Sequence, residues 1–267
     1  MCETDRPKLL IIVPTLDSLE LLPRLVSSLQ QQTWPYWRLI FIDGPSSPQH
    51  RAWLQQCCSA EHRCSWVAQD PHRSGIFGAM NQGFSQAAPE DWLLFWGSDD
   101  WAASPSVIAS AISEIQAADQ SLDLLVCRAR YASAVTQHLA RTACFHSSGL
   151  LGNFAYRRAL WFGATPPHQA TFFGPGARAK LGHYDPSFNL SADLNYFLQI
   201  SRHPSLLVLC RDLEIVHISD GGVSGKQVRN RLAEVRRAYR SVYGLYWLFP
   251  YLARYVRRLI SLMLSYA

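Results

Sequence analysis

Two adjacent acids, Asp99 and Asp100, are the residues of this chain whose types and spacing point most directly to chemistry. They follow an apolar run, residues 92–96, which is typical of a buried strand. Two like charges at the end of such a strand repel each other and cost free energy unless a cation or donor groups lie against them. A divalent metal that holds a phosphate-bearing ligand would explain the pair. The alternative is an ordinary solvated turn, since turns favour aspartate.

Two other predicted strands also end in polar residues. Residues 8–13 lead into Pro14 and Thr15, and residues 38–42 lead into Asp43. In a parallel sheet the carboxyl ends of the strands meet at one edge, and ligands bind in the crevice beyond that edge. We therefore expect these residues and the acid pair to line one crevice.

The elements that must position these residues alternate along the first half of the chain. Continuous apolar runs predict strands, and apolar residues at helical spacing predict helices. This alternation favours an α/β fold whose mostly parallel sheet has helices on both faces. The predicted strands are 8–13, 38–42, 65–68, 92–96 and 122–127, and the predicted helices are 18–29, 48–60, 75–88 and 105–118, with N-caps at Ser18 and Ser104.

The second half is less regular. From 129 to 171 the sequence predicts loops and short strands that reach over the crevice, followed by a helix at 192–201, strands at 206–210 and 214–218, and a glycine loop at 219–225. We expect a catalytic domain at 1–225, divided into a nucleotide-binding half (8–128) and an acceptor-side half (129–225), and a helical tail at 226–267.

Composition and charge exclude several classes of protein. Hydrophobic residues make up 48% and charged residues 17%, which is a globular composition and not a disordered one. Seven cysteines without metal-ligand spacing suggest a reducing compartment. The N-terminus has no apolar signal core, so we do not expect secretion. No uninterrupted run reaches the ~18 apolar residues of a membrane-spanning helix.

The net charge of +5 is uneven. Residues 226–267 contain nine lysines or arginines and one acid, Glu234, so this segment carries +8 and the rest of the chain −3. Within 240–267, leucines and aromatic residues interleave with arginines, and Pro250 is expected to interrupt any single helix. This pattern fits a peripheral contact with an anionic membrane. The alternative is a helix packed on the catalytic domain or on a second subunit, and the segment is too apolar for a nucleic-acid groove.

Taken in order, these motifs resemble a family-2 glycosyltransferase of the GT-A fold, and most of all the bacterial enzymes of exopolysaccharide assembly, the colanic-acid-type group. The resemblance covers residues 8–225. Any one motif is weak, but eight in the expected order are specific. The matching segments are 11–15, 32–34, 41–44, 75–83, 97–100, 168–173, 192–194 and 221–224.

The resemblance implies an inverting, metal-dependent transfer of a sugar from a nucleotide-sugar donor to a hydroxyl of a glycan acceptor, which we expect to be lipid-linked, in surface polysaccharide assembly. It implies a divalent cofactor, Mn²⁺ or Mg²⁺, and a cytoplasmic protein that is peripheral at the inner face of the plasma membrane. The implied site residues are Asp193 as general base; Pro14, Thr15, Asp43, Arg73, Asn81 and Asp99 for the donor; Asp100, Asp99 and His217 for the metal or diphosphate; and His168 and Gln169 on the acceptor side.

The sequence departs from the family pattern at two places. After Asp43 it reads Gly-Pro-Ser-Ser-Pro, without the later acid of the family. The segment 70–75 carries an extra residue and the basic His72 and Arg73, and Gly78 replaces an acidic position. These changes suggest altered contacts to the base or phosphates, so the donor cannot be copied from relatives.

Two other functions compete with this interpretation. A sugar nucleotidyltransferase also uses an α/β crevice and carboxylate-held metal, but it needs a glycine-rich loop with Arg or Lys after the first strand, and residues 14–18 are not such a loop. A non-catalytic sugar- or nucleotide-binding module would not need Asp99, Asp100 and Asp193, and their presence argues against it.

Overall fold

The computed structural model describes residues 8–118, 121–132, 139–146, 148–219 and 227–265 of the 267-residue chain. A single mixed sheet lies at the centre of this part of the chain. Its strands are β1 (Leu9–Thr15), β2 (Trp37–Asp43), β3 (Cys64–Ala68), β4 (Trp92–Phe95), β5 (Trp101–Ala102), β6 (Leu124–Ala132), β7 (Leu139–Ala143), β8 (Gly149–Gly152), β9 (Thr171–Phe173) and β10 (Leu207–Ser219).

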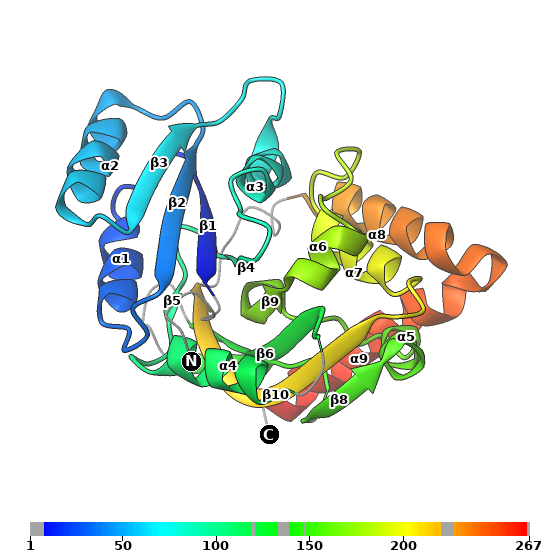
Figure 1. The fold of residues 1–267 in the computed structure, drawn as a ribbon. Coiled ribbons are helices and arrows are strands. Elements are labelled where there is room, and N and C mark those ends of the chain that lie inside the picture. Colours follow the sequence, from blue (N-terminus) through cyan, green and yellow to red (C-terminus); the bar gives the residue numbers. More distant parts are fainter. Residues whose placement is uncertain (1–7, 119–120, 133–138, 147, 220–226, 266–267) are drawn as a thin grey trace.

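Helices cover the sheet, and the C-terminal part of the chain is also helical. In Figure 1 the first helices lie around β1–β3, whereas the later helices gather on the opposite side of the molecule. The α-helices are α1 (Leu22–Gln30), α2 (Pro48–Ala60), α3 (Gly75–Phe84), α4 (Val107–Ala117), α5 (Asn153–Trp161), α6 (Pro175–Lys180), α7 (Ala192–Ile200), α8 (Val228–Tyr243) and α9 (Leu248–Ser265), with 3₁₀ turns η2 (His168–Ala170) and η4 (Gly244–Trp247).

The strand order is β3-β2-β1-β4-β9-β6-β10-β5, with β7 beside β6 and β8 beside β10. The four strands β3, β2, β1 and β4 are parallel, and β9 runs antiparallel between β4 and β6. The predicted α/β fold with a mostly parallel sheet is therefore confirmed. In the sheet, β4 from the first half of the sequence lies beside β9 from the second half, so both halves contribute to the cores on its two faces.

Burial on both faces explains the continuous apolar runs. In β1 the side chains alternate: Leu10 and Ile12 join the core beneath α3, whereas Leu9, Ile11 and Val13 join the core beneath α1, α2 and α4. A strand covered on both faces has no solvent side, so it shows no polar alternation. The core on the α3 face of the sheet also includes residues of α5, α7 and α8.

Several predicted boundaries are wrong. Ser18 does not cap α1, because the helix begins at Leu22. The main-chain oxygen of Ser18 instead accepts a hydrogen bond from Leu21 N at 3.0 Å. Ser104 does not cap α4, whose N-cap is Ser106. Helix α5 lies where loops and short strands were predicted. The strands expected at 206–210 and 214–218 are one strand, β10, whose register against β6 shifts between Cys210 and Val216.

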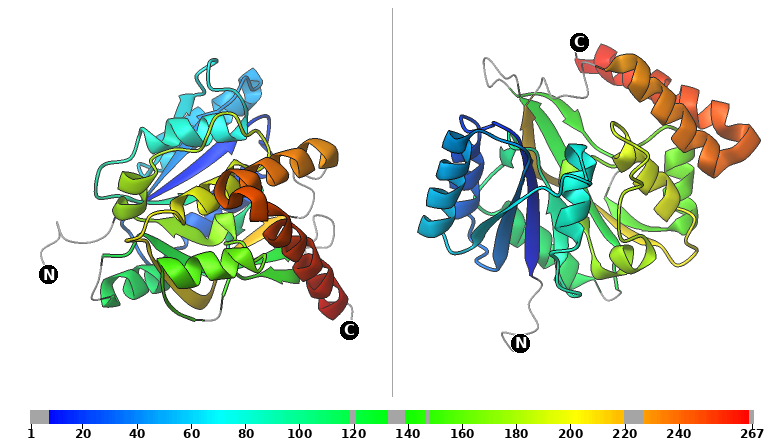
Figure 2. Two further views of the ribbon diagram at one scale, coloured as in Figure 1. Left: turned by 90° about the vertical axis from the view of Figure 1, so that its right-hand side faces the viewer. Right: turned by 90° about the horizontal axis from the view of Figure 1, so that it is seen from above.

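The C-terminal segment is a helical hairpin that packs on the rest of the protein (Figure 2). Helix α8 lies against α7, and α9 lies against α5 and α8. The chain turns at Gly244, whose φ is +55°, and not at Pro250. Pro250 falls in the first turn of α9, where a missing N–H removes no helical hydrogen bond, so its predicted role as a helix breaker is wrong. Of the helices described, none is long and apolar enough to span a bilayer.

Candidate functional site

The carboxyl ends of β1, β2 and β4 meet at one edge of the sheet, as the sequence predicted. Thr15 lies opposite Asp43 in the parallel β1–β2 register, and Ile12 lies opposite Phe95 in the β1–β4 register. Pro14 and Thr15 at the end of β1 are therefore neighbours of Asp43 and of the turn that follows β4. Since Trp96 N donates to Ile12 O at 3.1 Å, the pairing continues up to the start of that turn.

Asp43 is buried and its carboxylate is fully engaged by the protein. Oδ1 accepts hydrogen bonds from Thr15 Oγ1 at 2.9 Å and Ser46 Oγ at 2.7 Å, and Oδ2 accepts from Arg51 Nε at 3.1 Å. His50 Nε2 also lies 3.2 Å from Oδ1, without the orientation of a hydrogen bond. In this arrangement Asp43 fixes the ends of β1 and β2 and the start of α2, and it presents Thr15 and Arg51 at the edge of the sheet.

Asp99 and Asp100 occupy a tight turn between β4 and β5. The turn is closed by Asp100 N, which donates to Gly97 O at 3.2 Å, and by Gly97 N, which donates to Asp100 Oδ2 at 2.6 Å. Asp100 is only 1% exposed. Burial, followed by the charge of Asp99, raises the pKa of Asp100 well above its ordinary value, and burial also raises the pKa of Asp99. Both directions follow from burial, which disfavours the charged form of a carboxylate, and for Asp100 also from the like charge beside it.

The acid pair fits a cation. Asp100 Oδ1 is buried and has no hydrogen-bond partner among the described residues. Both carboxylates also lean over Gly97, where a Cβ atom would lie 2.7 Å from Asp99 Oδ1 and 3.3 Å from Asp100 Oδ2. A buried, unpaired carboxylate oxygen is costly unless something binds it, and carboxylate oxygen is a preferred ligand of Mg²⁺ and Mn²⁺.

His217 does not gather with the acid pair into a three-residue metal cluster. Its Nε2 lies 2.9 Å from Glu214 Oε1, and its ring lies edge-on to Trp101 with 5.4 Å between centroids. Within the described residues, no three side chains of His, Cys, Asp or Glu converge as a metal site. Strand β10, which carries His217, is nevertheless paired with β5, which follows the acid turn, since His217 lies opposite Trp101. The metal role of His217 therefore stays a prediction without a cluster to support it.

The acceptor-side residues are tied to β4 by η2. His168 stacks on Phe95, with 5.5 Å between ring centroids, and Trp96 Nε1 donates to Gln169 O at 2.9 Å. His168 Nε2 lies 2.7 Å from the hydroxyl of Tyr184. Both rings are buried, and burial lowers the pKa of His168 and raises that of Tyr184. His168 is therefore a neutral ring that holds η2 against the tip of β4.

Asp193 lies in the first turn of α7, as predicted, and is half-buried. Its charge acts on both His168 and Tyr184, which places it beside that pair. Its carboxylate makes no hydrogen bond or ion pair to the part of the chain that the structure describes. Because His168 stacks on Phe95 at the end of β4, the candidate base lies near the element that leads into the acid turn.

The two remaining donor-side candidates hold loops in place. Asn81 clamps the backbone of Tyr184, donating from Nδ2 to Tyr184 O at 2.9 Å and accepting from Tyr184 N at 2.7 Å. Arg73 is half-exposed and lies 3.8 Å from Asp70 in an ion pair. Direct contact of either side chain with a donor stays a prediction, and for Asn81 both polar atoms are already engaged.

Arg24 is the site residue that the sequence did not single out. Its Nη2 donates to Asp99 O at 3.1 Å and to Ser219 Oγ at 3.3 Å, and its guanidinium lies 3.5 Å from the centre of the Trp101 ring. It thereby joins α1, the acid turn and the end of β10. The only signal in the sequence was a cation on a helix that begins just after a site strand, and surface helices carry many such residues.

Comparison with known proteins supports the predicted family. Residues 10–175 match the sequence profile of glycosyl transferase family 2, a span that contains the acid turn and η2. An uncharacterized glycosyltransferase of Mycobacterium tuberculosis is 29% identical over 205 residues, which cover 73% of this chain and 70% of the relative. The prediction of a glycosyltransferase is thus confirmed at the level of the family.

Solved structures show the same fold. Staphylococcus aureus TarS 1–349 in complex with UDP-GlcNAc has a TM-score of 0.66 and 15% identity over 87% of this chain and 65% of that chain. The mannosyltransferase PcManGT of Pyrobaculum calidifontis, in complex with GDP-Man and Mn²⁺, has a TM-score of 0.66 and 12% identity over 94% of this chain and 70% of that chain. The present chain spans less than two thirds of the staphylococcal structure. At these identities the likeness confirms the predicted GT-A fold.

Proposed function

The chain belongs to glycosyl transferase family 2, and on that premise we propose that it moves a sugar from a nucleotide-activated donor to an acceptor hydroxyl with inversion at the anomeric carbon. The observation that carries the proposal is the buried, unpaired Oδ1 of Asp100 at the tip of β4. A buried acid with one free oxygen, at the ligand-binding edge of a parallel sheet, is suited to a cation and a phosphate-bearing donor.

Asp100 and Asp99 are the residues that would hold a divalent cation, and oxygens from the donor and water would complete its coordination. When bound, such a cation offsets the negative charge of the departing diphosphate. Arg24 adds a fixed positive charge next to the turn, because its charge acts on both carboxylates. The neighbour from Pyrobaculum calidifontis was solved with Mn²⁺, which makes Mn²⁺ the first metal to test.

Asp193 is the proposed general base. It takes the proton of the acceptor hydroxyl, whose oxygen bonds to the anomeric carbon as the bond from that carbon to the diphosphate oxygen breaks. The nucleoside diphosphate leaves with the electron pair. A half-buried carboxylate in the first turn of a helix, without a hydrogen bond or ion pair to the described residues, suits this role because it is available to accept a proton.

The donor end of the site is proposed to lie at the ends of β1 and β2. Because Asp43 is saturated by internal partners, we assign it to positioning, and we assign the direct contacts to Thr15, the backbone after Pro14, and Arg51. The neighbours bind UDP-GlcNAc and GDP-Man, so a uridine or guanosine diphosphate sugar is the proposed donor class.

The acceptor is proposed to be a lipid-linked glycan of surface polysaccharide assembly, reached through α9 at an anionic membrane. One face of α9 is apolar and about half-exposed, although the other face packs on the protein through Tyr251 and Arg254. Burial, followed by the charges of Arg231, Arg141 and Arg254, lowers the pKa of Arg258. Several positive charges therefore lie close together beside this face. The exposed apolar residues are Leu248, Phe249, Leu252, Val256, Leu259, Ile260 and Met263. Apolar anchoring beside unneutralised arginines fits an anionic lipid surface.

A donor screen tests the proposed activity. The full chain is incubated with UDP-GlcNAc, UDP-glucose, GDP-mannose and other nucleotide sugars, with Mn²⁺ or Mg²⁺, and release of nucleoside diphosphate is measured. We expect turnover of at least one donor that requires metal and is lost in Asp100→Asn. The exposed Asp212, which is paired with Arg128 on the surface, provides the control variant Asp212→Asn. No turnover of any donor, or equal turnover in Asp100→Asn, would contradict the proposal.

Vesicle sedimentation tests the membrane contact. The full chain is mixed with vesicles of phosphatidylglycerol and phosphatidylcholine, or of phosphatidylcholine alone. We expect binding only to the anionic vesicles, and at least a ~10-fold loss in the double variant Leu252→Asp, Val256→Asp, because burying such side chains contributes about 1.5–3 kcal/mol each. Leu21→Asp, at an exposed position directly before α1, should bind like wild type, because α1 and α9 lie on different sides of the molecule (Figure 1). Unchanged binding in the double variant would remove α9 from the contact.

A further inference from the structure

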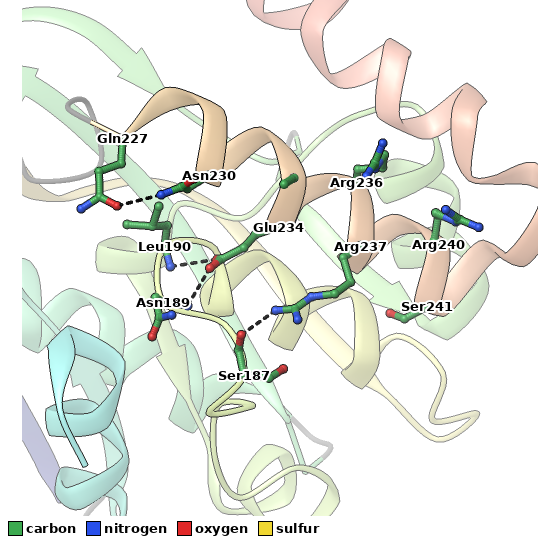
Figure 3. A pocket seen from close by; sticks show the side chains of 11 residues that line it. Ser187, Asn189, Leu190, Gln227, Asn230, Glu234, Arg236, Arg237, Arg240 and Ser241 are labelled. Atoms are coloured by element: carbon green, nitrogen blue, oxygen red, sulfur yellow. Dashed lines mark hydrogen bonds between the residues drawn. The ribbon is translucent and has the colours of Figure 1, made fainter. Parts of the chain in front are cut away.

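Glu234 is the single acid of the basic segment 226–267, and its carboxylate is held by the backbone of the loop before α7. It accepts three backbone hydrogen bonds from consecutive residues: Oε1 accepts from Asn189 N, and Oε2 accepts from Leu190 N and Ser191 N, each at 2.9 Å. Figure 3 shows the Glu234 side chain reaching from α8 to the loop that carries these residues. Three N–H groups on one carboxylate form a strong, charge-assisted contact.

This contact lies directly before α7. Ser191 is the N-cap residue of that helix, and its own side chain makes no capping hydrogen bond. The N–H group of Ser191 is one of those at the helix end that lack a helical partner, whereas those of Asn189 and Leu190 belong to the loop before it. Glu234 therefore fixes the loop that leads into α7. Asp193, the proposed base, follows Ser191 by two residues in the first turn of the helix.

A second residue of α8 holds the same loop one turn further along. Arg237 donates to Ser187 O at 2.6 Å, and its guanidinium lies 3.9 Å from the centre of the Phe188 ring. At the other end of the loop, Asn81 clamps the backbone of Tyr184. The loop 185–191 is thus fixed between α3 and α8, and the first turn of α7 inherits its position from both.

We propose that Glu234 is a positioning residue for catalysis: by holding the N–H groups of 189–191, it sets the place and orientation of Asp193 beside His168 and Tyr184. This inference rests on the proposed role of Asp193 as the base. If Glu234 has this role, α8 helps to position the catalytic residues, although its composition alone indicates only the start of a basic tail. A base displaced by about 1 Å can cost roughly 100-fold in rate, so a contact distant from the reacting atoms can control turnover.

The fold should tolerate removal of this carboxylate. Glu234 lines an open cavity of about 760 Å³ between α8 and the loop. Water can therefore reach the three N–H groups in Glu234→Ala, so these groups are not left buried without partners. Arg236 provides a matched control on the same helix, because it is exposed, makes no hydrogen bond or ion pair to the described residues, and points away from the loop in Figure 3.

The test is a double-mutant cycle on the full chain with the donor found in the screen above, with circular dichroism to check folding. We expect Glu234→Ala to lower kcat roughly 10- to 100-fold, with less than a ~3-fold change in donor KM, and Glu234→Gln to recover part of the rate because its amide oxygen still accepts. Arg236→Ala should match wild type. In the Asp193→Asn background, adding Glu234→Ala should lower the residual rate less than ~2-fold, since the residue that Glu234 positions is already disabled.

Each outcome decides one question. If Glu234→Ala lowers the rate by the same factor with and without Asp193, Glu234 stabilises the site without acting through the base, and the inference is wrong. If Glu234→Ala keeps the wild-type kcat, the inference is also wrong, whereas Asp193 remains the base as long as Asp193→Asn retains only a small residual rate. If Asp193→Asn itself turns over at the wild-type rate, the proposed base is wrong, and that failure is separate.

Discussion

Replacing Gly97 by alanine should damage the acid turn without unfolding the protein. The φ angle of Gly97 lies outside the left-handed region, so alanine can adopt the same backbone conformation. A Gly→Ala change at such a position stabilises the folded state by about 0.4–1 kcal/mol, because it lowers the conformational entropy of the unfolded chain. The added Cβ atom, however, would lie 2.7 Å from Asp99 Oδ1 and 3.3 Å from Asp100 Oδ2. Both carboxylates must therefore move, although the backbone need not.

The size of the effect follows from that overlap. Ordinary van der Waals contact begins near 3.4 Å, so Asp99 Oδ1 has to move by about 0.7 Å. A shift of about that size in groups that bind the donor diphosphate should reduce kcat/KM about 10- to 100-fold, or roughly 1.4–2.7 kcal/mol of transition-state stabilisation. The concentration of Mn²⁺ required for half-maximal rate should rise as well.

The assay is release of nucleoside diphosphate as a function of Mn²⁺ and donor concentration, together with the free energy of unfolding in urea without ligands. Gly152→Ala is the matched control, since its φ is −72° and a Cβ atom there would meet nothing within 4 Å. We expect the free energy of unfolding of Gly97→Ala to equal that of wild type or to exceed it by up to about 1 kcal/mol, whereas its kcat/KM falls. Wild-type kcat/KM and an unchanged Mn²⁺ requirement in Gly97→Ala would refute the role given to the turn.

Three further predictions concern residues around the site. Asn81→Ala removes both hydrogen bonds to the Tyr184 backbone and should lower the free energy of unfolding in urea by about 1–3 kcal/mol; no loss would show that the clamp is dispensable. Gly163→Ala places a Cβ atom 2.4 Å from Arg254 N at a φ of +78°, so it should destabilise the protein by about 2–4 kcal/mol and expose α9 to proteolysis, whereas wild-type protease resistance would contradict this packing. Because burial lowers the pKa of His168 below 6.5, the unfolded state binds a proton more readily than the folded state, and the stability due to neutral His168 is lost as pH falls below about 6.5. The stability advantage of wild type over His168→Phe should therefore shrink between pH 7 and pH 5, and a constant difference would refute a neutral buried ring.

The site edge was predictable because its signals are local. Apolar runs that end abruptly in Thr15, Asp43 or Asp99 mark strands buried on both faces, and parallel pairing then places their ends together. The first turn of α7 with Asp193 was predictable for the same reason, since a polar residue precedes an apolar helical pattern.

What the sequence did not predict depends on contacts between distant segments. Strand β5 has two residues and exists because Trp101 and Ala102 pair with β10. Arg24 reaches the acid turn across 75 residues of sequence, and Thr15 donates to Asp43 across 28. No local pattern encodes such contacts. Pro250 was misread for a different reason: a proline in the first turn of a helix and one in its middle look alike until the helix start is known.

Calorimetric titration of Mn²⁺ in the presence of a nucleoside diphosphate tests the central claim most directly. The account predicts that the wild-type chain binds Mn²⁺ with its diphosphate partner, and that Asp100→Asn loses this binding while its thermal unfolding is nearly unchanged, since Asp100 Oδ1 has no hydrogen-bond partner to lose among the residues that the structure describes. Equal Mn²⁺ affinity in Asp100→Asn and wild type would contradict it.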